Sequence, residues 1–120
     1  MNRLVEIRSY NLTPGSRVEF HRLVSEVSLP MLKRWGVDVV AFGPSPHDTS
    51  SYYLIRAYDS LEHRQSSQDA FYGSAEWRQG PREKIISLIE SETSVVIEMD
   101  SSTVDSLRKS AEDQSLPGLG

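Results

Sequence analysis

The sequence predicts an α+β fold of the ferredoxin-like type, with a four-stranded antiparallel sheet and helices on one face. The first observation is the order of its segments, which is strand, helix, strand, strand, helix, strand. The second is length, because 120 residues suffice for a single core in one domain. Short connections and right-handed crossovers then place the first and third strands in the middle of the sheet, with the fourth strand beside the first.

Four segments are predicted to be strands because apolar residues alternate along them or because β-branched and aromatic residues dominate them. They are residues 3–12, 37–43, 52–58 and 93–100. The turn sequences "TPGS" and "PSPHDTSS" separate strands from their neighbours.

The helices are predicted from apolar side chains at helical spacing. Residues 17–35 form the first helix, and Gly36 is placed to end it, so that Trp35 is expected in the core. A second helix begins at Leu61, and residues 82–91 carry a third apolar face.

The helix that begins at Leu61 has a half-polar inward stripe. Its positions at i, i+3, i+4 and i+7 onwards are Leu61, Arg64, Gln65, Gln68 and Tyr72. In one interpretation, Arg64 lies at the edge of the stripe and reaches solvent or nearby backbone carbonyls. In the other, the stripe lines a small cleft between this helix and the sheet, since aromatic walls with a few polar groups are typical of ligand pockets.

Alternation divides the sheet into two faces. One set is expected to meet the helices: Val5, Ile7, Tyr53, Ile55, Ala57, Val95 and Ile97. The opposite set includes Glu6, Arg8, Tyr10, Leu54, Arg56 and Tyr58. We expect that second face to be either solvated or covered by a second subunit, with the cross-strand pairs Glu6–Arg56 and Arg8–Glu98.

The chain divides into a domain over residues 1–99 and a C-terminal tail over residues 100–120, where aromatic residues are absent and serine is frequent. Within the tail, Val104, Leu107 and Ala111 fall on one side of a short helix that Thr103 can cap. We expect this helix to dock across a dimer, with Leu116 and Leu119 as further contacts.

Composition excludes several classes of function. The net charge of −4 and the lack of a basic cluster argue against nucleic-acid binding. No cysteine is present, so disulfides, thiol nucleophiles and cysteine metal sites are excluded. The first residues contain no apolar signal segment and no stretch approaches membrane-spanning length, so a cytoplasmic protein without membrane contact is expected.

The sequence resembles the NIPSNAP family of the dimeric α+β barrel superfamily. The resemblance rests on "VEIRSYNLTPGS", on "LPMLKRWGVDVVAFGP" and above all on "YYLIRAYDSLEHRQSSQDAFYGSAEW". It implies a homodimer in which two sheets oppose each other to form a barrel. It also directs attention to the cavity between helices and sheet, because related folds use that cavity.

Six residues are candidates for a site in that cavity. Tyr53, Gln68, Tyr72 and Trp77 would hold a substrate, while His21 and Arg64 would be catalytic. Arg64 would stabilise an enolate or phenolate, and His21 or a tyrosine would move the proton.

No cofactor and no metal are expected. The histidines lack ligand spacing, and no carboxylate cluster joins them. Some relatives in the superfamily bind haem through a histidine, but His63 falls opposite Leu61 and His21 has no evident partner.

Two functions remain open from the sequence. One is a cofactor-independent enzyme, a monooxygenase or isomerase acting on a small aromatic or polyketide-like molecule. The alternative is a non-enzymatic binding or protein-interaction module.

Overall fold

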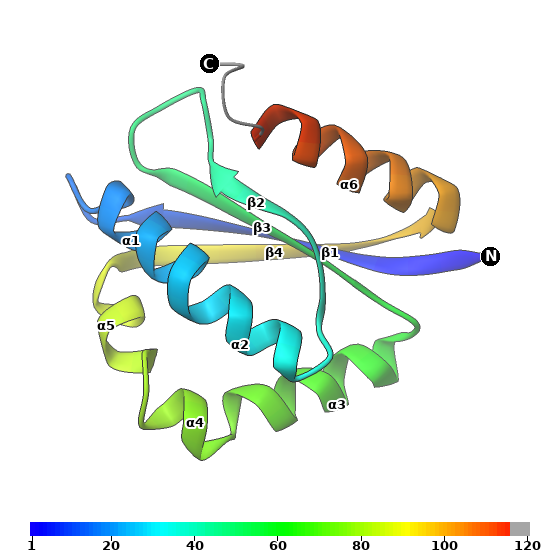
Figure 1. Ribbon diagram of the computed structural model, residues 1–120, viewed down its shortest axis with the longest axis horizontal. Coiled ribbons are helices and arrows are strands. Elements are labelled where there is room, and N and C mark those ends of the chain that lie inside the picture. Colours follow the sequence, from blue (N-terminus) through cyan, green and yellow to red (C-terminus); the bar gives the residue numbers. More distant parts are fainter. Residues whose placement is uncertain (116–120) are drawn as a thin grey trace.

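The computed structural model describes residues 1–115 and contains one four-stranded antiparallel sheet with the strand order β2-β3-β1-β4 (Figure 1). The strands are β1 (Asn2–Leu12), β2 (Asp38–Pro44), β3 (Ser51–Tyr58) and β4 (Ile89–Asp100). The helices are α1 (Arg17–Leu23), the π-helical segment η1 (Val24–Ser28), α2 (Leu29–Arg34), α3 (Leu61–Tyr72), α4 (Ala75–Arg78), α5 (Arg82–Ser87) and α6 (Ser101–Ser115). The α+β ferredoxin-like fold predicted from the sequence is confirmed, with β1 and β3 in the middle of the sheet.

The long helix predicted over residues 17–35 is interrupted by a π turn. The backbone N–H of Leu29 bonds to the carbonyl of Val24, five residues earlier, instead of four. Pro30 follows directly and has no N–H to donate, so the regular ladder is also broken there. The helix continues to Arg34, and Gly36 follows with a positive φ of 75°, which suits glycine at the end of a helix.

The prediction that Trp35 lies in the core is wrong. Its side chain is 41% exposed, and its indole N–H donates to a carboxylate oxygen of Glu76 at 2.7 Å. The ring meets Phe71 edge to face, with ring centroids 6.1 Å apart. The core under this end of the helix is instead filled by Trp77 and Phe71.

The expected assignment of the two sheet faces is also wrong. Helices α1 to α5 cover the face that carries Tyr10, Tyr52 and Leu54, and these side chains share one core cluster with Phe20 and Trp77. Glu6 and Arg56 lie on the same face and are 0% and 1% exposed. The face predicted to be a dimer interface is therefore buried within the chain, because its charged residues pair with one another under the helices.

The opposite face is covered in part by α6, which lies across the sheet from the other helices (Figure 1). A second core cluster forms there from Val5, Val40, Ala57 and Val104, and Leu107 packs against it. The tail thus forms the predicted helix, but it docks on its own sheet. Leu116 and Leu119 lie outside the described residues.

Two polar contacts hold α6 in place. Asp100, not Thr103, caps the helix, because its carboxylate accepts hydrogen bonds from the backbone N–H and the hydroxyl of Ser102. Farther along, Arg108 donates to the carbonyl of Val39 at 3.0 Å and forms an ion pair with Asp38 at 2.8 Å.

The register of β1 confirms one of the two predicted charge pairs. Glu6 lies opposite Arg56 on β3. Arg8 lies opposite Ser94 on β4, whereas Glu98 faces Leu4, so the predicted pair Arg8–Glu98 is wrong. Among the described residues, no helix is both long and apolar enough to cross a membrane.

Candidate functional site

The polar side chains in the stripe of α3 bind a buried carboxylate, that of Glu6 on β1. Ser60 caps α3 by accepting a hydrogen bond from the backbone N–H of His63 at 3.0 Å, and this start places Arg64, Gln68 and Tyr72 on the face toward the sheet. Arg64 and Gln68 each donate to one oxygen of Glu6 at 2.7 Å. The stripe is therefore polar because it must satisfy a charge on β1.

Arg56 satisfies the other oxygen of Glu6. Its Nη2 and Nε lie 2.5 Å and 3.1 Å from that oxygen, and both residues are fully enclosed. Burial by itself raises the pKa of Glu6. The charge and hydrogen bonds of Arg56, together with the hydrogen bond from Gln68, outweigh burial and lower the pKa to about 2. Glu6 thus stays ionised and fully engaged, which makes it a poor proton acceptor at neutral pH.

Tyr72 stands where this cluster meets a cleft. Its hydroxyl oxygen accepts from Arg56 at 2.8 Å and from Arg8 at 3.4 Å. The two guanidinium groups also lie 5.7 Å and 5.9 Å from the centre of its ring. Both acceptor positions of the hydroxyl are thereby taken by positively charged donors.

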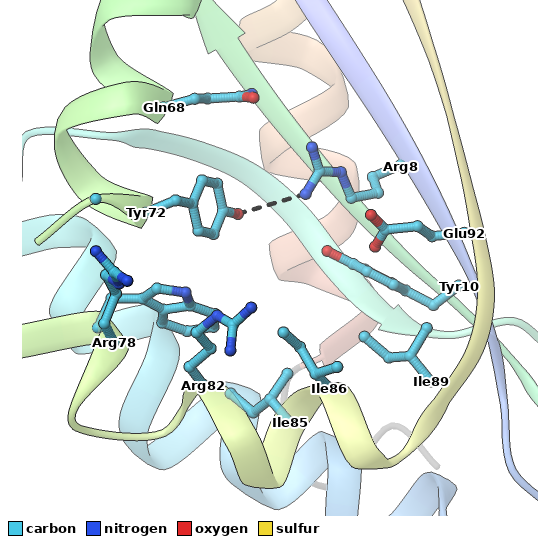
Figure 2. A pocket seen from close by; sticks show the side chains of 12 residues that line it. Arg8, Tyr10, Gln68, Tyr72, Arg78, Arg82, Ile85, Ile86, Ile89 and Glu92 are labelled. Atoms are coloured by element: carbon cyan, nitrogen blue, oxygen red, sulfur yellow. Dashed lines mark hydrogen bonds between the residues drawn. The ribbon is translucent and has the colours of Figure 1, made fainter.

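The cleft has a volume of about 580 Å³ and lies between β1, the end of α3, α4, α5 and the start of β4 (Figure 2). Such a volume is typical of small-molecule pockets. Its walls combine aromatic and apolar side chains with arginines: Arg8, Tyr10, Gln68, Tyr72, Gly73, Trp77, Arg78, Arg82, Ile85, Ile86, Ile89 and Glu92.

The packing of aromatic rings fixes the inner wall of the cleft. Ser74 caps α4 by accepting from the backbone N–H of Trp77, which turns the indole inward against Tyr72 with ring centroids 5.4 Å apart. Tyr10, which Figure 2 shows across the cleft from Tyr72, comes from β1. Burial, together with the nearby Tyr72, raises the pKa of Tyr10 to about 12, so its hydroxyl remains protonated.

The structure brings four of the six candidate residues together. Arg64 and Gln68 bind Glu6, Tyr72 bonds to Arg56 and Arg8, and Trp77 meets Tyr72 edge to face. Of these four, Gln68, Tyr72 and Trp77 line the cleft, whereas Arg64 lies behind it and shares the carboxylate of Glu6 with Gln68.

The other two candidates lie elsewhere. The ring nitrogen Nδ1 of His21 is 2.6 Å from the hydroxyl of Tyr52, and His21 lines a separate cavity of about 320 Å³ with Phe42 and Arg108. Tyr53 alternates with Tyr52 and Leu54 along β3, so it lies on the face toward α6. His21 and Arg64 thus do not form the expected catalytic pair, and Tyr53 does not reach the cleft.

Sequence reasoning missed Arg8, Tyr10 and the pair Glu6–Arg56 as parts of this site. The signal was present in the spacing, because Glu6, Arg8 and Tyr10 alternate along one face of β1 opposite Arg56. Charge alternation is usually the sign of a solvated face, and this interpretation concealed a buried cluster. Among residues 1–115, no group of three or more histidine, aspartate or glutamate side chains could hold a metal ion.

Comparison with solved structures identifies the same fold in several bacterial proteins. An uncharacterized NIPSNAP domain protein from Burkholderia xenovorans is 22% identical with a TM-score of 0.73, covering 82% of this chain and 95% of that chain. A NIPSNAP family protein of unknown function from Agrobacterium tumefaciens is 21% identical with a TM-score of 0.75, covering 81% and 87%.

A more divergent structure belongs to a candidate antibiotic biosynthesis monooxygenase from Bordetella bronchiseptica. It is 18% identical with a TM-score of 0.61 and covers 84% of this chain and 98% of that one. At these identities the likeness concerns the fold alone. No curated protein sequence matches the chain.

The family comparison is more specific, because it tests the sequence position by position. The NIPSNAP family model matches residues 5–102, which include most of β1, the other three strands and the whole cleft. The chain therefore belongs to the NIPSNAP family.

Proposed function

We propose that the cleft between the sheet and helices α3 to α5 binds a small aromatic or polyketide-like molecule and transforms it without a metal or an organic cofactor. The observation that carries this proposal is the hydroxyl of Tyr72. It is held by two guanidinium groups at the inner wall of an aromatic cleft of about 580 Å³. Rigidly held donors of this kind stabilise negative charge that develops on a substrate oxygen.

The chemistry that suits such a site passes through an enolate or phenolate. An isomerase would move a proton from one carbon of the substrate to another. A monooxygenase would use dioxygen to convert a CH₂ group of an activated aromatic substrate to a carbonyl and release water. In both reactions Tyr72 and Arg8 stabilise the oxyanion, while Arg64 acts as a positioning residue because it holds Glu6 and hence Arg56.

The fold of the candidate antibiotic biosynthesis monooxygenase supports this reaction class by analogy. The alternative, a binding module without turnover, is favoured by a different observation. Glu6 is fully engaged, and His21 lies outside the cleft. Among the described residues, Glu92 is the only carboxylate that lines the cleft and could accept a proton.

Turnover and binding can be separated in one set of measurements. The purified protein is incubated in air with a panel of hydroxylated aromatics, anthrones and β-diketones. Oxygen uptake and mass changes of the products are then followed. The enzyme proposal expects a product with one panel member, reduced at least tenfold in Tyr72→Phe. A ligand that raises the melting temperature and is never converted would instead identify a binding module.

We also propose a homodimer, through the face that carries α6 and not through the face predicted from the sequence. Val95 and Ile97 on β4 are 53% and 38% exposed, although their neighbours Val5 and Ile7 pack in the second core cluster. Exposed β-branched side chains beside a core are typical of an interface.

Sedimentation tests this assembly. Val95→Lys should shift a dimer toward monomer at micromolar concentration, whereas Glu98→Gln, which changes the net charge by the same one unit at an exposed position on the same strand, serves as the control. A monomeric wild-type protein would contradict the proposal.

A further inference from the structure

We propose that the ligand of the cleft is an organic anion with a planar apolar body, whose negatively charged oxygen is bound by Arg8 and Tyr72 and whose charge is further matched by Arg78 and Arg82. This inference rests on the proposed function, because it names the class of molecule that the same cleft takes. It is carried by the distribution of charge, by the contacts of the arginines and by the orientation of one hydroxyl.

The cleft concentrates positive charge in a protein whose net charge is −4. Five guanidinium groups line the cleft or the cluster behind it, and two carboxylates oppose them. The arginines are Arg8, Arg56, Arg64, Arg78 and Arg82, and the carboxylates are Glu6 and Glu92. Part of this excess positive charge lies in a buried region, where solvent screens it weakly. An anion is therefore the complementary ligand.

Glu6 cannot neutralise this excess. Its two oxygens already accept four hydrogen bonds from Arg56, Arg64 and Gln68. Arg8 has no short contact with a carboxylate of the described residues: it lies 3.8 Å from Glu6, 3.4 Å from Ser94 and 3.4 Å from Tyr72, and it also interacts with the hydroxyl of Tyr10. A guanidinium with loose contacts at the wall of a cleft can receive a carboxylate or enolate without breaking a strong ion pair.

The arginines at the mouth of the cleft differ from the arginines elsewhere in the chain. Away from the cleft, Arg22, Arg34 and Arg108 each have a carboxylate oxygen within 2.8 Å. The guanidinium groups of Arg78 and Arg82, on neighbouring helices beside the cleft, have no hydrogen bond or ion pair with any described residue (Figure 2). The unpaired guanidinium groups are thus both found where the ligand would bind.

The hydroxyl of Tyr72 supplies the directional contact. Because its oxygen accepts from Arg56 and Arg8, its own hydrogen must point away from both. No acceptor for that hydrogen is found among the described residues, and the hydroxyl lies at the wall of the cleft (Figure 2), where a ligand can accept it. Tyr72 therefore donates to the ligand, and an anionic oxygen is the strongest acceptor for it.

The remaining walls define the body of the ligand. Ile85, Ile86 and Ile89 form one side, and the indole of Trp77 lies beside the ring of Tyr72. Flat aromatic surfaces and branched aliphatic side chains favour a planar ring system over a flexible or sugar-like molecule.

Binding of 2-naphthoate and of its uncharged analogue 2-naphthamide, measured by calorimetry at low salt, tests the proposal. The carboxylate should bind at least tenfold more tightly than the amide. Arg82→Gln, at an exposed and unpaired position, should weaken naphthoate severalfold without affecting folding. Arg8→Gln and Tyr72→Phe should weaken it tenfold or more while changing naphthamide little.

Arg22→Gln is the matched control, because it removes a guanidinium that is paired with Glu19 and Glu26 away from the cleft. Equal affinity for the two probes, absence of binding by both, or equal losses in Arg82→Gln and Arg22→Gln would overturn the anion proposal. None of these results would decide the proposed function, which depends on conversion of a substrate in the turnover panel.

Discussion

Each face of the sheet buries a set of side chains, but the two sets differ in chemistry. On one face, Val104 of α6 packs against small apolar side chains of the sheet, which are Val5, Val40 and Ala57. Under α3, the sheet presents Glu6 and Arg56, which α3 meets with polar side chains of its own. Apolar burial stabilises the fold directly, whereas a buried ion cluster is at best neutral compared with apolar residues of similar size. Apolar side chains on both faces thus stabilise the fold, and the ion cluster is better explained by the cleft beside it.

Breaking the ion cluster on one side only should have the largest effect. Glu6→Gln leaves Arg56 buried without its carboxylate, and such a loss costs about 3–5 kcal/mol in the free energy of unfolding. Denaturant unfolding measures this loss. A cost similar to that of the exposed control Glu62→Gln would mean that solvent reaches Arg56.

Acid should weaken the same face. The pKa of Glu6 is about 2 in the folded protein, against an ordinary value of 4.5. Because the folded-state pKa is depressed, this stabilisation is fully present above pH 4.5 and is lost as the pH falls toward 2. It amounts to about 3 kcal/mol. Unfolding measured between pH 2 and 6 should show this loss, and Glu6→Gln should remove that part of the pH dependence.

The apolar face should respond to a loss of volume instead. Val104 is buried between α6 and the sheet, so Val104→Ala should cost about 2 kcal/mol and should not depend on pH between 3 and 6. Val18→Ala, on the exposed side of α1, is the control. If Val104→Ala costs no more than this control, α6 is not docked in solution.

The smallest change in stability is expected from the double variant Glu6→Leu with Arg56→Met. Removing both fully buried charges leaves neither of them stranded, and Arg64, whose side chain is 22% exposed, can turn its guanidinium group to solvent, so the free energy of unfolding should stay within about 1–2 kcal/mol of the wild-type value. Tyr72 would lose its stronger donor, and affinity for 2-naphthoate should fall. Unchanged affinity in a folded double variant would show that the buried ion cluster does not contribute to binding in the cleft.

The sequence was informative wherever the inference was local. Most of each strand and helix and the half-polar stripe of α3 follow from spacing, and the pairing of Glu6 with Arg56 follows from the order of the strands. Residues 89–91 are an exception, because the sequence predicts them as the end of a helix and the structure places them in β4. Gln68, Tyr72 and Trp77 were found in this way as part of the cleft. His21 and Tyr53 were misplaced, because their position depends on which side of the sheet each helix covers.

By itself, therefore, the sequence determined the elements, their order and their pairing, since these depend on periodicity and on short connections. Only the tertiary structure decided which face each element buries. A strand has a period of two and presents two equivalent faces, so a reversed assignment remains consistent with every local pattern. The choice was made by contacts between distant segments, in which Arg64 and Gln68 of α3 meet Glu6 of β1, and Val104 of α6 packs in the same cluster as Val5.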